Sequence, residues 1–142
     1  MREQINIPEL RFPQYNRKWE TKRIGDLGKF VGGGTPNTKV SHYWEGQIAW
    51  LSSSDIREGS IHEYETGRFI TNKAIKESAT KPIPENSILM VSRVGIGKFA
   101  VSQTKLCTSQ DFTNLIPKHD NSYFLAYLLS SKTRLFIRFS QG

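Results

Sequence analysis

Cysteine and long apolar runs are nearly absent from this sequence. Its 142 residues include a single cysteine, Cys107, which excludes an intrachain disulfide and fits a reducing compartment. No apolar run approaches the roughly 20 residues needed to span a bilayer, and the N-terminus has no signal-peptide pattern. We therefore expect a cytoplasmic protein without membrane contact and with one hydrophobic core.

Acidic residues are scarce in the second half of the chain. Residues 1–67 hold nine Lys+Arg and nine Asp+Glu, whereas residues 68–142 hold eleven against four. The whole formal net charge of +7 therefore lies in the second half. Such an asymmetry favours a polyanionic partner, although a basic surface kept for solubility is about equally compatible with charge alone.

Signatures of catalysis and metal binding are also missing. The histidines and the cysteine are far apart and show no ligand spacing. Glu20 and Lys22 have the Glu-x-Lys form of metal-dependent nucleases, but no acid precedes them at a suitable distance. We expect no catalytic residue, no metal and no cofactor, and therefore a binding protein.

Two glycine-rich runs invite a nucleotide-binding interpretation that their context excludes. Residues 95–100 match a dinucleotide fingerprint formally, but a strand pattern follows, so Gly95 and Gly97 are better explained as turn positions with positive φ. Residues 32–36 lack the Lys-Ser/Thr ending of a P-loop. We interpret them as a loop whose backbone passes close to another surface, and contact with a DNA backbone is one such use.

Hydrophobic patterns predict an α+β fold, a single domain in which helices flank a twisted, mostly antiparallel sheet. The predicted strands cover residues 48–51, 61–65, 88–91, 98–101 and 112–116, and the last three form an antiparallel meander with a polar loop at 104–111. Predicted helices cover one or two turns within 19–30, then 72–79 capped by Thr71, and 120–139 capped by Asp120 or Asn121, with a possible break near 130–131. Trp50 is expected in the core. Residues 1–18 are expected to form an extended lead-in to a domain over 19–142.

A series of short motifs in a fixed order resembles the target recognition domain of the specificity subunit of type I restriction-modification enzymes. No single motif is specific, but the order is, and the resemblance runs from about Pro8 to Gly142. The motifs are Trp19, Gly33-Gly34-Thr35-Pro36, Tyr43-Trp44-x-Gly46-x-Ile48-x-Trp50, Ser54-Asp55, Ile70-Thr71, Pro84-x-x-Ser87-Ile88-Leu89, Ser92-Arg93, Ile96-Gly97-Lys98, Gln110-x-Phe112-x-Asn114-Leu115-Ile116-Pro117 and Phe124-Leu125-x-Tyr127-Leu128-Leu129.

The resemblance implies a DNA-reading subunit without chemistry of its own. It implies recognition of one half of a bipartite double-stranded DNA target, and association with methyltransferase (M) and ATP-dependent restriction/translocase (R) subunits that carry the cofactor sites. Family members usually have two recognition domains joined by long helices, so we expect this chain to be an excised domain or a half-subunit truncated before the helical spacer. The alternatives are a freestanding nuclease or an RNA-binding module with a basic face.

Polar side chains beside cations follow the strand at 48–51 and flank the turn at 95–97, a combination suited to the edges of bases. The predicted base-reading residues are Ser53, Ser54, Asp55, Arg57, Arg93, Lys98, Ser109, Gln110 and Asp111. The predicted phosphate contacts are Gly34, Thr35, Asn37, Thr38, Lys73, Lys76, Lys81 and Lys105. For Arg93, a structural ion pair with Asp55 or Asp111 is the alternative.

Overall fold

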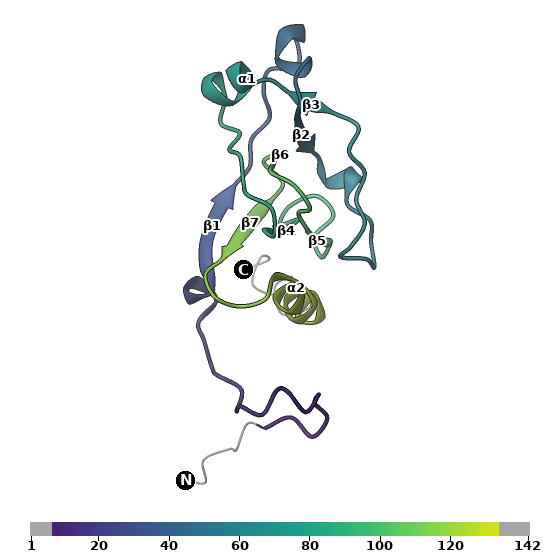
Figure 1. Cartoon of the computed structure of the whole chain (residues 1–142). Coiled ribbons are helices and arrows are strands. Elements are labelled where there is room, and N and C mark those ends of the chain that lie inside the picture. The colour runs from purple at the N-terminus through teal and green to yellow at the C-terminus, as the bar shows by residue number, and fades with distance from the viewer. Residues whose placement is uncertain (1–6, 134–142) are drawn as a thin grey trace.

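Residues 7–133, which the computed structural model describes, form two small β-sheets and two α-helices (Figure 1). The strands are β1 (Gly28–Gly32), β2 (Ile48–Leu51), β3 (Phe69–Ile70), β4 (Ile88–Met90), β5 (Phe99–Val101), β6 (Leu106–Thr108) and β7 (Thr113–Pro117). The helices are α1 (Asn72–Glu77) and α2 (Ser122–Ser131), with short 3-10 turns η1 (Ile24–Asp26), η2 (Ser41–Trp44) and η3 (Ser53–Asp55). The predicted α+β class is confirmed.

The smaller sheet has the order β3-β2-β6. Strand β2 runs antiparallel to β3 but parallel to β6, with Leu51 opposite Thr108. The prediction of a polar loop over 104–111 was wrong at this point, because residues 106–108 form β6 and all three are buried. A run of only three residues between polar neighbours carries no periodic signal, so its pairing with β2 decides its conformation.

The larger sheet has the order β1-β7-β4-β5 and is antiparallel throughout. The three strands predicted as a meander are present, but their order differs. Strand β7 pairs with β4 through Leu115 and Ile88, and not with β5, because the chain leaves this sheet to form β6 between β5 and β7. The turn before β5 has φ values of 84° at Gly95 and 103° at Gly97, which confirms the predicted positive-φ positions.

Two further predictions for local structure were wrong. Most of the helix predicted within residues 19–30 is absent, since η1 has three residues and β1 follows it, paired with β7. An apolar spacing of three to five residues does not distinguish helix from strand, and pairing decides. The strand predicted at 61–65 is reduced to an isolated bridge between Ile56 and Tyr64.

Both α-helices begin at the predicted caps. The Thr71 hydroxyl accepts a hydrogen bond from the Ala74 N–H, and Asn121 Oδ1 accepts one from the Phe124 N–H. Helix α1 ends at Glu77, two residues earlier than predicted. The end of the predicted last helix, with Leu135, Phe136 and Phe139, lies outside the described residues. No helix within 7–133 is long and apolar enough to cross a membrane.

The two sheets share one core, and each is covered by a helix. Leu51 and Leu106 of the smaller sheet pack with Leu89 and Ala100 of the larger one. Helix α2 packs Leu125, Ala126 and Leu129 against Ile88, Val101 and Leu115 on the outer face of the larger sheet. Trp50, 3% exposed, packs with Ile70, Cys107 and Ala74 of α1, which confirms its predicted place in the core.

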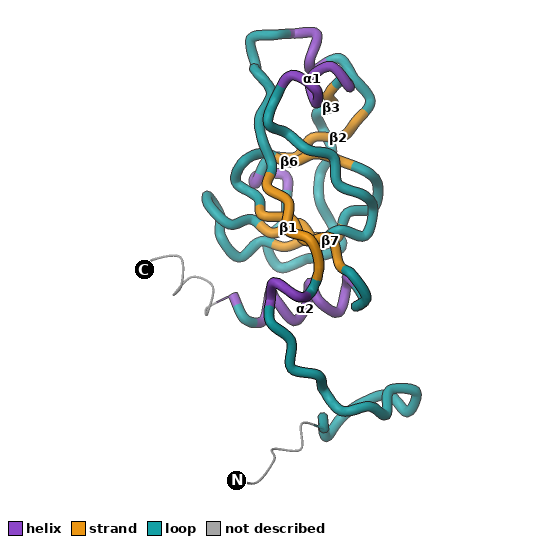
Figure 2. The backbone as a smooth tube through the Cα atoms, turned by 90° about the vertical axis from the view of Figure 1, so that its left-hand side faces the viewer, coloured by secondary structure: helices purple, strands orange, loops and turns teal. Residues whose placement is uncertain are grey.

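The elements are arranged along one long axis, with α1 and the smaller sheet at one end and α2 at the other (Figures 1 and 2). Residues 7–23 contain no helix or strand and run beyond α2. Where this segment joins the fold, the Trp19 ring stacks on Phe124 at 5.4 Å and the Lys22 amine lies 3.1 Å from Asp120. These contacts fasten the segment to the start of α2.

The Cys107 thiol leads to a testable pH dependence. Burial raises the pKa of Cys107 from 9.0 to about 11, so the unfolded chain loses this proton first as the pH rises. The stability linked to this group is therefore intact below pH 9.0 and falls between pH 9.0 and about 11. In urea unfolding from pH 8 to 11, we expect the wild type to lose up to about 2–3 kcal/mol more than Cys107→Ala. Parallel profiles for the two proteins would contradict this assignment.

Candidate nucleic-acid interface

The carboxyl ends of β2 and β6 meet at one edge of the smaller sheet, because these strands are parallel. Residues 52–57 leave β2 there, and residues 109–111 leave β6. The Ser109 N–H donates to the Leu51 carbonyl at 2.8 Å, which joins the two exits directly. Two groups of predicted base-reading residues, far apart in the sequence, are thereby neighbours.

The segment after β2 is held as a tight turn by its own polar groups. Asp55 Oδ2 accepts from the Ser52 N–H at 2.7 Å, and the Asp55 N–H donates to the Ser52 carbonyl at 3.0 Å. The hydroxyls of Ser52 and Ser54 lie 2.8 Å apart. Asp55 is thus engaged within the turn, whereas Ser54 is exposed.

Arg68, which sequence reasoning missed, completes this turn. Its Nη2 donates to Ser52 Oγ at 2.6 Å and to Asp55 Oδ2 at 2.9 Å, and its guanidinium carbon lies 4.6 Å from the centre of the Trp50 ring. The backbone N–H of Trp50 donates to the backbone carbonyl of Arg68, which places the two residues opposite each other where β3 meets β2. The sequence offered only a weak signal, a cation directly before the apolar pair Phe69-Ile70 that precedes the predicted cap Thr71.

The β4–β5 turn connects the same two loops. The Lys98 amine donates to the Ser53 carbonyl at 3.3 Å, and the N–H groups of Ser92 and Arg93 donate to the Asp111 carbonyl at 2.8 and 3.3 Å. Arg93 is exposed. Within the described residues its alternative ion pair is not formed, since the Asp55 carboxylate contacts Arg68 and the Asp111 carboxylate contacts Ser109.

The glycine loop after β1 passes close to the end of β6, as predicted. Its Gly34 N–H donates to the Thr108 carbonyl, and the Gly34 carbonyl accepts from Trp50 Nε1, both at 2.9 Å. The Thr35 hydroxyl then donates to the side-chain carbonyl of Gln110. Gly34 is buried, whereas Thr35, Asn37 and Thr38 are exposed and available to a ligand.

These contacts bring most predicted base readers to one surface, here called the polar edge. The polar edge consists of Thr35, Ser52, Ser53, Ser54, Asp55, Arg68, Ser92, Arg93, Lys98, Gln110 and Asp111. Ser109 is 3% exposed and supports Asp111 from below, so it is part of the scaffold of this surface. Arg57 lies just beyond it in an exposed ion pair with Glu63 at 2.5 Å.

The predicted phosphate-binding lysines are exposed, and none of them is part of the polar edge. Lys73 and Lys76 are on α1. Lys105 precedes β6, at the opposite end of that strand from Gln110. Lys81 follows Thr80, whose hydroxyl donates to the Thr108 carbonyl, so it lies toward the end of β6 that leads to Gln110.

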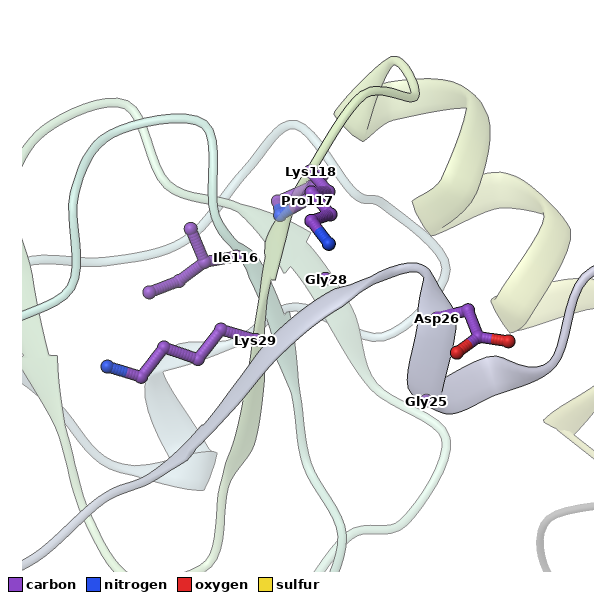
Figure 3. A pocket seen from close by; sticks show the side chains of 7 residues that line it. All are labelled: Gly25, Asp26, Gly28, Lys29, Ile116, Pro117 and Lys118. Atoms are coloured by element: carbon purple, nitrogen blue, oxygen red, sulfur yellow. The ribbon is translucent and has the colours of Figure 1, made fainter.

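A second surface feature lies at the far end of the β1–β7 pair. There a shallow groove of about 550 Å³ is lined by Gly25, Asp26, Gly28, Lys29, Ile116, Pro117 and Lys118. Figure 3 shows the Lys29 and Ile116 side chains on one side and Asp26 pointing away from them. No predicted site residue lines this groove, and within residues 7–133 no group of three or more His, Cys, Asp and Glu could hold a metal ion.

Comparison with known proteins identifies the family. A model of the type I restriction modification DNA specificity domain matches residues 16–142. The chain belongs to this family. The specificity domain is 40% identical over 119 residues to the MjaIX specificity subunit, a type I restriction enzyme component of Methanocaldococcus jannaschii. It is 35% identical over 117 residues to the EcoR124I/EcoR124II specificity subunit of Escherichia coli.

The specificity domain corresponds to only part of these relatives. The alignments cover 82% and 79% of this chain but 28% of each relative. Its fold matches the HsdS subunit from Thermoanaerobacter tengcongensis with a TM-score of 0.66 over 92% of this chain and 31% of that one, at 14% identity. A chain of a type I R-M system matches with a TM-score of 0.60 over 80% of this chain and 27% of that one, at 17% identity. The predicted family and recognition-domain fold are confirmed.

The glycine loop gives a prediction with a matched control. A Cβ at Gly33 would lie 2.0 Å from the Ser109 carbonyl oxygen and 2.4 Å from that of Thr108, whereas a Cβ at Gly32 would meet nothing within 4 Å. We expect Gly33→Ala to lower the free energy of unfolding by about 1–3 kcal/mol, because backbone must move apart. Gly32→Ala should leave it nearly unchanged. Equal urea midpoints for the two variants would show that the loop is free to move away from β6.

Proposed function

We propose that this specificity domain reads one half of a bipartite sequence in double-stranded DNA, as part of the specificity subunit of a type I restriction-modification enzyme. The observation that carries the proposal is the polar edge, where four loops and Arg68 present hydroxyl, amide, carboxylate and guanidinium groups on one surface. The family match and the names of the relatives agree with it.

The polar edge has the chemistry needed to distinguish base pairs in the major groove. An arginine or lysine recognises guanine, glutamine recognises adenine, and an aspartate accepts from cytosine. Arg93, Gln110 and Asp111 supply these groups at the ends of strands whose positions are fixed by the shared core. Ser53, Ser54 and Lys98 add further donors and acceptors at the same edge, and Arg57 lies just beyond it.

Affinity without sequence preference would come from the predicted phosphate contacts, most of which lie outside the polar edge. Neutralised phosphates release counterions, so such contacts strengthen binding to any duplex and make it sensitive to salt. Their exposure suits Lys73, Lys76, Lys81 and Lys105 to this role, and the uncharged Thr35, Asn37 and Thr38 would donate hydrogen bonds to phosphate oxygens. Gly34 and Ser109, which are buried, would act by supporting the loops.

Bond-breaking and bond-making would belong to other chains. In this proposal the methyltransferase (M) subunits and the ATP-dependent restriction/translocase (R) subunits act on DNA that the specificity subunit has selected, in the cytoplasm. The exposed aromatic rings of the described chain do not favour an RNA-binding sheet, since most lie on residues 7–23 and α2. They are Phe12, Tyr15, Trp19, Phe124 and Tyr127, with Phe69 on β3.

The decisive experiment maps methylated bases in cells that carry the complete enzyme. We expect one bipartite motif, and exchanging this domain for the corresponding part of the EcoR124I/EcoR124II subunit should change one half of that motif. An unchanged motif would refute the proposal. A nuclease is tested separately by incubating the purified chain with supercoiled plasmid and Mg²⁺, where nicking would contradict a purely binding role.

Variants of Arg93 and Lys76 separate recognition of a base pair from sequence-independent affinity for DNA. We expect Arg93→Ala in the complete enzyme to reduce discrimination at one base pair by about 5- to 150-fold. Lys76→Ala should weaken all duplexes alike and reduce the slope of log K against log salt by about 0.9. Lys118→Ala, in the distant groove, is the charge-matched control. Competition binding over a library of site variants measures all three, and identical profiles for Arg93→Ala and Lys76→Ala would contradict the assignment.

A further inference from the structure

Arg68 is the most firmly held cation of the polar edge. The Trp50 ring lies against its guanidinium, and Ser52 and Asp55 accept hydrogen bonds from the same terminal nitrogen, Nη2. Its side chain is nevertheless 44% exposed. Within the described part of the chain no acceptor lies on Nη1 or Nε, so these N–H groups remain free for a ligand.

Asp55, in contrast to Arg68, is largely buried and engaged by its neighbours. Its side chain is 18% exposed, and a single oxygen, Oδ2, receives the Ser52 N–H, the Ser52 hydroxyl and Arg68. A carboxylate used in this way fixes its neighbours. It therefore suits the orientation of Arg68 better than a contact of its own with cytosine.

We propose that Arg68 reads a base and that Asp55 is its positioning residue. This inference rests on the proposed function and names a reader that the sequence did not reveal. A free arginine loses side-chain entropy when it binds, whereas a guanidinium already stacked and hydrogen-bonded loses little. Guanine, whose major-groove edge presents the acceptors O6 and N7, is the base that the free N–H groups of Arg68 would select.

The position of Arg68 favours a base over a phosphate. Its side chain contacts Ser52 and Asp55, which bound the turn that carries Ser53 and Ser54, and its backbone lies opposite Trp50 of β2. A phosphate contact needs only positive charge and tolerates mobility, as Lys76 on α1 provides. Fixing a guanidinium on an indole and a carboxylate adds orientation, which matters when one base edge must be distinguished from another.

The test uses the complete enzyme and scores discrimination at every base pair of the motif by competition binding. We expect Arg68→Ala to reduce discrimination at one G·C pair by about 5- to 150-fold. Asp55→Asn should relax the same pair, and the double variant should be no worse than Arg68→Ala there. Arg68→Lys should not rescue it, because an ammonium cannot keep the two hydrogen bonds and the stacking together. Arg17→Ala, outside the polar edge, is the charge-matched control.

Three results would overturn the inference. Asp55→Asn could relax a different base pair from Arg68→Ala, which would make Asp55 a reader in its own right. Arg68→Ala could weaken all sequences equally, which is the signature of a phosphate contact. It could also lower only the melting temperature and leave the motif unchanged, which would make Arg68 a structural residue. If Arg68→Ala does not fold, Arg68→Lys and Asp55→Asn decide the same question.

Failure of this inference is distinguishable from failure of the proposed function. If the unaltered enzyme shows no preferred sequence, the proposed function is wrong. If it has a motif that the Arg68 and Asp55 variants retain in full, only the assignment of these two residues is wrong.

Discussion

The parallel pairing of β2 with β6 is the constraint on which the polar edge depends. Antiparallel partners would send their following loops to opposite ends of the sheet, whereas parallel partners send them to the same end. With Leu51 opposite Thr108, the segments that follow these two residues emerge side by side. The core shared with the larger sheet then adds the β4–β5 turn to the same edge.

Close packing beneath the loops keeps this edge in place. Gly33 lies against the backbone of Thr108 and Ser109, and Gly34 against Ala79 and Thr80, so the glycine loop closes over the end of β6. Thr80, Thr108 and Asn114 are buried here, and Asn114 Nδ2 and Thr80 Oγ1 both donate to Thr108. Because buried polar groups are costly to leave unpaired, such a layer tolerates few alternative loop positions.

Sequence reasoning found the features that local chemistry determines and missed those that depend on pairing. The caps Thr71 and Asn121, the turn glycines, the strand 48–51 and buried Trp50 were all predictable, since each has a local or compositional signature. Strands β1 and β6 were not, because glycine and short mixed runs become strands only when a partner is present. Arg68 was missed for the same reason, since its importance comes from the register that sets it opposite Trp50.

The cross-strand pair of Arg68 and Trp50 also bears on how such a domain can change over generations. Loop residues such as Arg93 and Gln110 are exposed, so they can be substituted without a change in core packing. Position 68 is different, since its guanidinium covers an indole that is itself fastened to the glycine loop through Gly34. Homologues that evolve to recognise new DNA sequences should therefore vary freely at exposed loop positions. A change at Arg68 would require compensating changes in the residues packed beneath it.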